Sequence, residues 1–91
     1  MVESRQWDIV LTREAEKSLR RLPRTLLQRI DRVLAQLSEN PTPLDCKRLT
    51  GYPNLYRVRV GGWRIVYTLE HDRLVVLVIR IAPRGEVYRN L

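Results

Sequence analysis

The sequence predicts an α+β fold in which an N-terminal strand and a two-helix hairpin pack on an antiparallel β-sheet meander. Two patterns support it. Apolar residues recur with helical spacing in the first half of the chain, and short strand-like runs separated by turn residues fill the second half. A chain of 91 residues has room for one modest hydrophobic core. We therefore expect residues 1–91 to form a single domain.

The chain begins with a strand and a first helix. Residues 7–11 are short, apolar and rich in strand-forming types, and they stop at Thr12, a residue favoured as a helix N-cap. Apolar side chains then follow one helical stripe, at Ala15, Leu19 and Leu22. This stripe predicts a helix that ends before Pro23.

A second helix gives the strongest periodic signal in the chain. Its apolar residues fall at i, i+1, i+4, i+7, i+8 and i+11, at Leu26, Leu27, Ile30, Val33, Leu34 and Leu37. The opposite face holds polar and charged residues, Gln28, Arg29, Asp31, Arg32 and Gln36. Pro23 suits the boundary between the two helices, and Pro41 disfavours helical conformation at Asn40. The second helix should therefore end near Asn40.

The second half of the chain predicts a loop and three strands. Residues 41–54 contain three prolines and a glycine, which is typical of an ordered loop, and this loop should cross over the domain. Strand-like runs follow at residues 55–60, 63–69 and 74–81, separated by Gly61-Gly62 and by His71-Asp72. They should form an antiparallel meander.

The first hairpin of this meander separates apolar residues from arginines. A two-residue turn at Gly61-Gly62 places Arg59 opposite Arg64. One face can pack on the helices and consists of Tyr56, Val58, Val60, Trp63, Ile65 and Tyr67. The other face holds Arg57, Arg59 and Arg64. Like charges about 5 Å apart cost stability, so we expect an anionic partner; the alternative is a solvated face whose charges discourage edge pairing.

The register of the last strand depends on the turn around His71-Asp72. A three-residue turn places Arg80 on the same face as the other arginines, whereas a two-residue turn would press it into the core. Burial of an unpaired charge is costly, which favours the three-residue turn. Beyond Pro83, Arg84 and Tyr88 should lie beside the meander on a short tail, as a phosphate clamp with an aromatic stacking partner.

The charge composition indicates a polyanionic partner. The net charge is +7, and 15 of the 17 Lys and Arg residues are arginines. From Pro41 onward there are nine Lys and Arg against four Asp and Glu, compared with eight against six before it. Arginine forks suit phosphate and stack on bases, which favours nucleic acid over a membrane surface. The alternative source of arginine richness is genomic base composition or thermal adaptation.

Several classes of protein are excluded. Cys46 is the single cysteine and His71 the single histidine, so neither a disulfide scaffold nor a structural metal site is expected, and no cofactor is implied. His71 falls in a predicted turn far from Arg59 and Arg64, so we give it no catalytic role. The longest apolar run, residues 74–79, is too short to span a bilayer. We expect a cytoplasmic protein that does not bind membranes.

The chain resembles the RelE/ParE toxin superfamily over nearly its whole length. The motifs that carry the resemblance are Lys47-Arg48-Leu49 with Gly51, Tyr56-Arg57-Val58-Arg59-Val60-Gly61 with Trp63-Arg64-Ile65-Val66-Tyr67, and Arg84 followed by Glu86-Val87-Tyr88. Their order and spacing together are specific. The resemblance implies a RelE-like fold and the toxin component of a type II toxin–antitoxin system, here of the RelE type.

RelE-type toxins are metal-independent endoribonucleases, or mRNA interferases. The resemblance implies that this chain enters the ribosomal A site and cuts mRNA by attack of a ribose 2′-hydroxyl on the adjacent phosphate. The implied catalytic residues are Arg57, Arg59, Arg64, Arg84 and Tyr88. Further RNA-binding residues are Lys47, Arg48, Arg80 and Arg89.

One departure from the family affects the mechanism. Arg57 and Arg59 stand where the best-known ribonuclease of the family has lysines. Arginine stays protonated at any working pH and does not act readily as a general base, and Tyr88 is a poor base at its usual pKa of about 10. The arginines should therefore stabilise charge and position RNA, with slower cleavage as one consequence.

The resemblance also implies partners and leaves two alternative functions. A cognate antitoxin should wrap the toxin, and the pair should bind its operator DNA through the antitoxin. One alternative is a ParE-like inhibitor of DNA gyrase. The other is a non-catalytic module that binds RNA or an antitoxin only.

Overall fold

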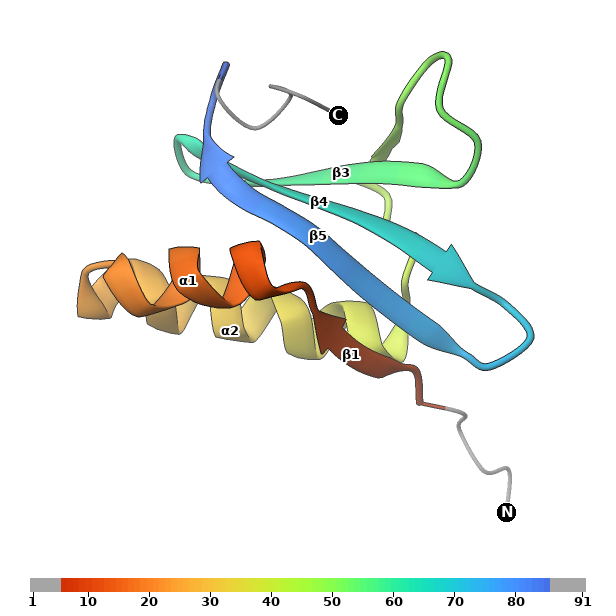
Figure 1. Cartoon of the computed structure of the whole chain (residues 1–91), viewed down its shortest axis with the longest axis horizontal. Coiled ribbons are helices and arrows are strands. Elements are labelled where there is room, and N and C mark those ends of the chain that lie inside the picture. The colour runs from red at the N-terminus through yellow and green to blue at the C-terminus, as the bar shows by residue number, and fades with distance from the viewer. Residues whose placement is uncertain (1–5, 86–91) are drawn as a thin grey trace.

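The computed structural model describes residues 6–85, in which two helices pack against one face of a five-stranded sheet (Figure 1). The elements in chain order are β1 (Asp8–Leu11), α1 (Arg13–Arg21), α2 (Arg24–Glu39), β2 (Lys47–Arg48), β3 (Leu55–Val60), β4 (Trp63–Glu70) and β5 (Val75–Pro83). The predicted α+β fold is confirmed, with its N-terminal strand, two-helix hairpin and three-stranded meander.

Local sequence signals determine where the helices begin and end. Thr12 caps α1: its Oγ1 accepts a hydrogen bond from the Ala15 backbone N–H at 3.2 Å and donates one to the Ile79 carbonyl at 2.7 Å. Pro23 is the cap residue before α2, and Asn40, in extended conformation, follows its end. The predicted boundaries at Thr12, Pro23 and Asn40 are confirmed.

The sheet is mixed because its first strand joins the last. The strand order is β1-β5-β4-β3-β2, and β1 runs parallel to β5 with Asp8 beside Val75 and Leu11 beside Val78. All other pairs are antiparallel. The sequence pattern predicts the N-terminal strand but not its partner, since the two strands are at opposite ends of the chain.

The β3–β4 hairpin has the predicted register. Gly61 and Gly62 form the turn, Arg59 lies opposite Arg64, and Val60 lies opposite Trp63. Gly61 has a φ of 60°, a left-handed backbone conformation that residues with a Cβ adopt rarely and that glycine adopts readily.

Two expectations about the sheet were wrong. Residues 41–54 are not loop throughout, because Lys47–Arg48 form β2 at the sheet edge, too short for any alternating pattern. The turn after β4 is longer than predicted: Glu70 pairs with Val75, which leaves four residues between them, and a bulge between Val66 and Tyr67 then shifts the pairing so that Val66 lies opposite Arg80. In a β-bulge, two residues of one strand lie opposite a single residue of the other. No sequence motif in this chain predicts the bulge.

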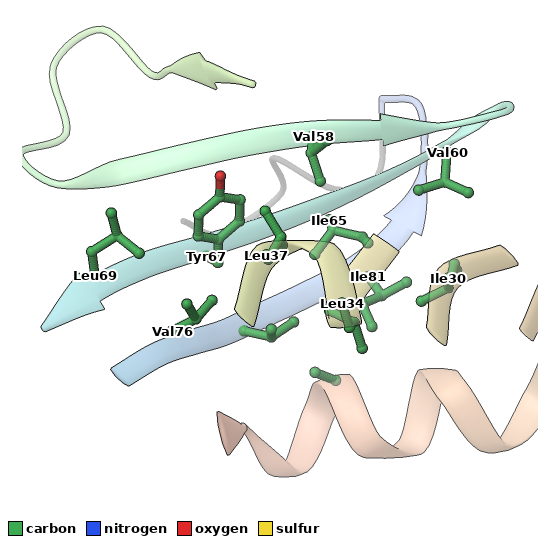
Figure 2. Packing of buried hydrophobic residues seen from close by; sticks show 12 residues of the cluster. Ile30, Leu34, Leu37, Val58, Val60, Ile65, Tyr67, Leu69, Val76 and Ile81 are labelled. Atoms are coloured by element: carbon green, nitrogen blue, oxygen red, sulfur yellow. The ribbon is translucent and has the colours of Figure 1, made fainter. Parts of the chain in front are cut away.

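The core lies between the helices and the sheet (Figure 2). The buried residues of α2 are Ile30, Leu34 and Leu37, and those of the hairpin include Val58, Val60, Ile65 and Tyr67. The Tyr67 ring stacks on Tyr56 at 5.7 Å, and its hydroxyl donates a hydrogen bond to the Pro41 carbonyl at 2.7 Å. The predicted apolar face of the hairpin is confirmed, and the arginines therefore lie on the side away from the helices.

Candidate nucleic-acid interface

The candidate site is built on the sheet face opposite the helices. Arg59 and Arg64 are direct cross-strand partners next to the Gly61-Gly62 turn. Lys47 of β2 lies opposite Arg57 of β3, and directly paired residues point to the same face. We call the four residues Lys47, Arg57, Arg59 and Arg64 the basic face. The edge strand β2 thus extends the predicted trio of arginines by one lysine.

Burial divides the basic face into two kinds of residue. Lys47 and Arg59 are exposed, whereas Arg57 and Arg64 are 7% and 6% exposed. On this face a second small apolar cluster surrounds the buried Leu55 and Val66, with Leu49, Ile79 and Ala82 packed against it. The face is therefore a partly apolar surface with embedded guanidinium groups rather than a fully solvated row of charges.

The two buried arginines lack acidic partners among residues 6–85. Arg64 donates from Nη1 to the Trp63 carbonyl at 3.3 Å, and the Arg57 Nε is buried without a hydrogen-bond partner. Burying a cation without a counter-charge is costly. A bound anion beside these groups would offset that cost.

Arg84 joins the exposed end of this face. Its backbone N–H donates to the Gly62 carbonyl at 3.0 Å, and β5 ends beside the turn with Ala82 opposite Arg64. Arg84 is exposed. Three arginines therefore lie close to the Gly61-Gly62 turn: Arg59 and Arg64 pair across the hairpin, and Arg84 is bonded through its backbone to Gly62.

Arg80 lies at the opposite edge of the meander. Its backbone pairs with Val66, but its Nη2 lies 3.4 Å from Oε2 of Glu14 in α1. The side chain of Arg80 is 15% exposed and that of Glu14 67% exposed. The RNA contact of Arg80 stays a prediction, and in the structure its side chain also pairs with Glu14 of the first helix.

Arg48 is separated from the basic face. It pairs with Tyr56, whose side chain packs on the helix side of the sheet. Arg48 lines a hollow of about 440 Å³ that the following loop forms, with Leu49, Thr50, Gly51, Tyr52 and Pro53. Lys47 and Arg48, both predicted to bind RNA, are thus neighbours in sequence but lie on opposite faces of the sheet.

Two arginines near the turn were missed by sequence reasoning. Arg29 and Arg32 of α2 line a hollow of about 200 Å³ together with Arg59 and Gly61. Their helical spacing assigned them only to the polar face of α2. No sequence signal identifies them, because their proximity to the turn depends on how α2 docks on the sheet.

Other candidates are placed as follows. His71 is exposed in the turn after β4, where its ring contacts Trp7 edge-on at 5.5 Å. Cys46 is a free, half-buried cysteine of the loop. Tyr88 and Arg89 lie outside the described residues. Within residues 6–85, no three His, Cys, Asp or Glu side chains are grouped to hold a metal ion, and neither helix is long and apolar enough to cross a membrane.

This arrangement suits binding and electrostatic stabilisation of a phosphodiester. Guanidinium groups bind phosphate oxygens with paired donors. This interaction is stronger where apolar surroundings exclude water. Arginines remain protonated, so Arg57, Arg59 and Arg64 supply cations and no proton acceptor. The site can stabilise a negative charge that grows on phosphorus-bound oxygens.

Comparison with known proteins identifies relatives over most of the chain. The family model of the ParE toxin of the type II toxin–antitoxin system ParDE matches residues 9–88. A RelE1 toxin of Methanocaldococcus jannaschii is 30% identical over 88 residues, which cover 93% of this chain and 98% of that protein. The mRNA interferase toxin RelE of Escherichia coli is 31% identical over 78 residues, 81% of each chain.

Solved structures agree with the sequence matches. A chain in the RelE–RelB complex of Pyrococcus horikoshii is similar with a TM-score of 0.78 and 26% identity, over 88% of this chain and 97% of that one. A chain of the intact Escherichia coli RelBE toxin–antitoxin complex gives the same TM-score at 25% identity, over 87% and 98%.

Proposed function

Because the chain belongs to the ParE toxin family of type II toxin–antitoxin systems and its relatives include RelE mRNA interferases, we propose that it is a ribosome-dependent, metal-independent mRNA endoribonuclease. It acts in the A site. A ribose 2′-hydroxyl attacks the adjacent phosphorus, the 2′-oxygen–phosphorus bond forms, and the bond to the 5′-oxygen of the next nucleotide breaks. The products are a 2′,3′-cyclic phosphate and a 5′-hydroxyl.

The observation that carries this proposal is the placement of Arg59, Arg64 and Arg84 next to the Gly61-Gly62 turn. The pentacovalent transition state gathers negative charge on its phosphoryl oxygens, and fixed cations stabilise such charge. Arg64 is held in a largely buried position, so it does not have to reorganise during the reaction. We assign Arg59 and Arg84, both exposed, to first contact with the RNA backbone.

The remaining predicted residues have supporting roles. Arg57 and Lys47 continue the basic face along the strand and position the backbone away from the cut. Tyr88 is proposed to stack on the base beside the scissile phosphate, and Arg89 to contact the backbone. None of the arginines removes the 2′ proton, so a variant with lysine at position 57 or 59 tests whether a base at these positions speeds cleavage.

Primer extension on a reporter mRNA with purified protein and ribosomes tests the activity. Discrete cuts at A-site codons are expected, and Arg64→Ala should lower the cleavage rate about 100-fold, the cost of removing one stabilising donor. Arg73→Ala is a matched control, because Arg73 is exposed and ion-paired with Glu70 at the far end of β4. Intact mRNA in the presence of ribosomes would refute the endoribonuclease proposal.

A second candidate function is favoured by the name of the matching family model, which describes ParE toxins. A ParE-like toxin would inhibit DNA gyrase and leave mRNA intact. A supercoiling assay with purified gyrase separates the two activities. Blocked supercoiling together with intact mRNA would replace the proposal above.

The third candidate is a non-catalytic module that binds RNA or an antitoxin only. Induced expression distinguishes it, because an inert module produces no growth arrest. Arrest that Arg64→Ala and Tyr88→Phe relieve, with the protein still folded, supports an enzyme.

We also propose a cognate antitoxin as partner. Related toxins have been solved with RelB, and an acidic or amphipathic segment would complement the net charge of +7. The antitoxin would carry the operator-binding part, so that the pair represses its own genes in the cytoplasm. Coexpression with the neighbouring reading frame should rescue growth and yield a stable complex; failure of every adjacent frame to do so would count against this partner.

A further inference from the structure

The hollow between α2 and the β3–β4 turn is a second place where arginines gather. Its lining residues come from one face of α2 and from the end of β3, and they are Arg29, Arg32, Val33, Gln36, Arg59, Val60 and Gly61. We call it the α2 pocket. Its volume of about 200 Å³ holds several waters at roughly 30 Å³ each, which is room for one phosphate group.

The charges of the α2 pocket are not neutralised within residues 6–85. Arg29, Arg32 and Arg59 make no ion pair there, whereas Arg73 and Arg80 are paired with Glu70 and Glu14. Arg29 and Arg32 are three residues apart on one helix, a spacing at which like charges destabilise. The cations of Arg29 and Arg32 thus lie beside a hollow that Arg59 also lines, and no counter-charge pairs with them within residues 6–85.

The turn allows Arg29 to come close. A Cβ placed on Gly61 would lie 3.3 Å from Arg29 Nη1, so the guanidinium occupies the space beside the glycine. With φ of 60°, Gly61 also has a backbone conformation suited to glycine. The residue therefore serves both the hairpin turn and the approach of α2.

The chemistry of the lining matches a phosphodiester. Val33 packs against the core and Val60 is buried, which makes the hollow partly apolar and strengthens charge interactions at its rim. Gln36 adds a neutral amide donor, and no acidic residue is among the lining residues. Arginine forks bind phosphate with paired donors.

We propose that the α2 pocket binds a backbone phosphate of RNA, separate from the phosphate that is cleaved. The inference rests on the proposed function and adds a second anchoring point to it. Arg59 belongs to both the basic face and the α2 pocket, so RNA would contact the turn from two sides. The phosphate belongs either to the messenger or to ribosomal RNA, which present the same chemistry.

The test compares two double variants that each remove two positive charges. Arg29→Ala/Arg32→Ala removes the α2 contribution to the pocket. Arg13→Ala/Arg24→Ala is the matched control, because both residues are exposed at the first positions of the helices and are not among the pocket residues. A third variant, Arg29→Lys/Arg32→Lys, keeps the charge, and circular dichroism verifies that all three are folded.

Affinity is measured for two probes, a short single-stranded oligoribonucleotide and bacterial ribosomes without messenger. We expect Arg29→Ala/Arg32→Ala to weaken binding to at least one probe about tenfold more than the control. Its slope of log affinity against log salt should also fall by about 1, as for one lost phosphate contact. The lysine variant should recover most of the affinity.

The pattern of losses identifies the source of the phosphate. A loss with the oligoribonucleotide assigns it to the messenger, and a loss with empty ribosomes alone assigns it to ribosomal RNA. Equal behaviour of the pocket and control variants with both probes would overturn the proposal. Neither binding measurement requires cleavage, so a protein that cuts no mRNA refutes the proposed function while this test still decides on the pocket.

Discussion

Arg57 and Arg64 are almost fully buried, and neither has an acidic partner within residues 6–85. Burying a cation without a counter-charge lowers the stability of a fold. Residues that cost stability without a structural return are typical of functional sites. The sequence predicts the face on which these side chains lie, because strand alternation determines it. It does not predict their burial, because burial depends on the tertiary packing of this face, which also carries the apolar cluster around Leu55 and Val66.

We predict that Arg57→Met stabilises the protein while it impairs function. Replacing a buried, unpaired cation by an apolar chain of similar length removes a desolvation cost, which we expect to amount to about 1 kcal/mol or more. Thermal unfolding should shift upward by roughly 4–8 °C for each kcal/mol in a domain of this size. Cleavage by the same variant should be slower, and a lowered unfolding temperature would show that Arg57 has a structural partner.

A second residue-scale prediction concerns Tyr67 and alkaline pH. Burial, with smaller contributions from Cys46, Tyr56 and Asp45, raises the pKa of the Tyr67 phenol well above its usual value of about 10. Above pH 10 the unfolded state loses this proton first, so the stabilisation is present below pH 10 and is lost as pH rises.

Unfolding midpoints measured from pH 8 to about 11.5 test this linkage. Tyr67→Phe should be less stable by about 1 kcal/mol at neutral pH, because the hydrogen bond to the Pro41 carbonyl is lost. Its alkaline decline should be shallower than that of the unsubstituted protein. Tyr52→Phe, at an exposed site, should keep the original pH dependence, and identical curves for all three proteins would contradict the assignment.

At the scale of elements, the sequence predicts the pairing register of a strand when a nearby turn determines it. It does not predict the register when distant parts of the chain determine it. The Gly61-Gly62 turn fixes the β3–β4 register within a few residues. The β5 register instead depends on Leu74, which has a left-handed φ of 52° unusual for leucine, and on a bulge beside Val66. The turn is one residue longer than predicted, and the bulge shifts the register by one more residue. The two shifts compensate, so Arg80 still lies opposite Val66 on the arginine-bearing face.

The contact between α1 and β5 gives an element-scale prediction. Thr12 Oγ1 caps α1 and also donates to the Ile79 carbonyl, next to the bulge. Thr12→Val, close in shape but without the hydroxyl, should lower the free energy of unfolding by about 0.5–2 kcal/mol, the usual range for a lost cap. Chemical denaturation measures this, with Thr12→Ser as the control that retains the hydroxyl. A loss of equal size in the serine variant would mean that packing of the methyl group dominates.

At the scale of the whole molecule, the tertiary fold brings positive charge from separate parts of the chain to one end. The larger excess of positive charge lies after Pro41, and all four residues of the basic face belong to that part of the chain. The α2 pocket adds Arg29 and Arg32 from the first half. Their contribution could not be read from helical spacing, since it follows from the position of α2 relative to the Gly61-Gly62 turn.

Because the arginines are concentrated near the turn, we expect the salt dependence of RNA affinity to be set by the location of each arginine and not by the net charge of the protein. Four phosphate contacts, at Arg59, Arg64, Arg84 and the α2 pocket, predict a slope of log affinity against log salt of about −3 for single-stranded RNA. Affinity should then fall roughly 50-fold between 50 and 200 mM salt. Arg84→Ala should reduce the slope by about 1. Arg73→Ala removes the same charge from the opposite end of the meander and should leave the slope unchanged. Equal slope changes for Arg84→Ala and Arg73→Ala would mean that RNA responds to the total charge, and that the gathering of arginines at the turn has no special role in binding.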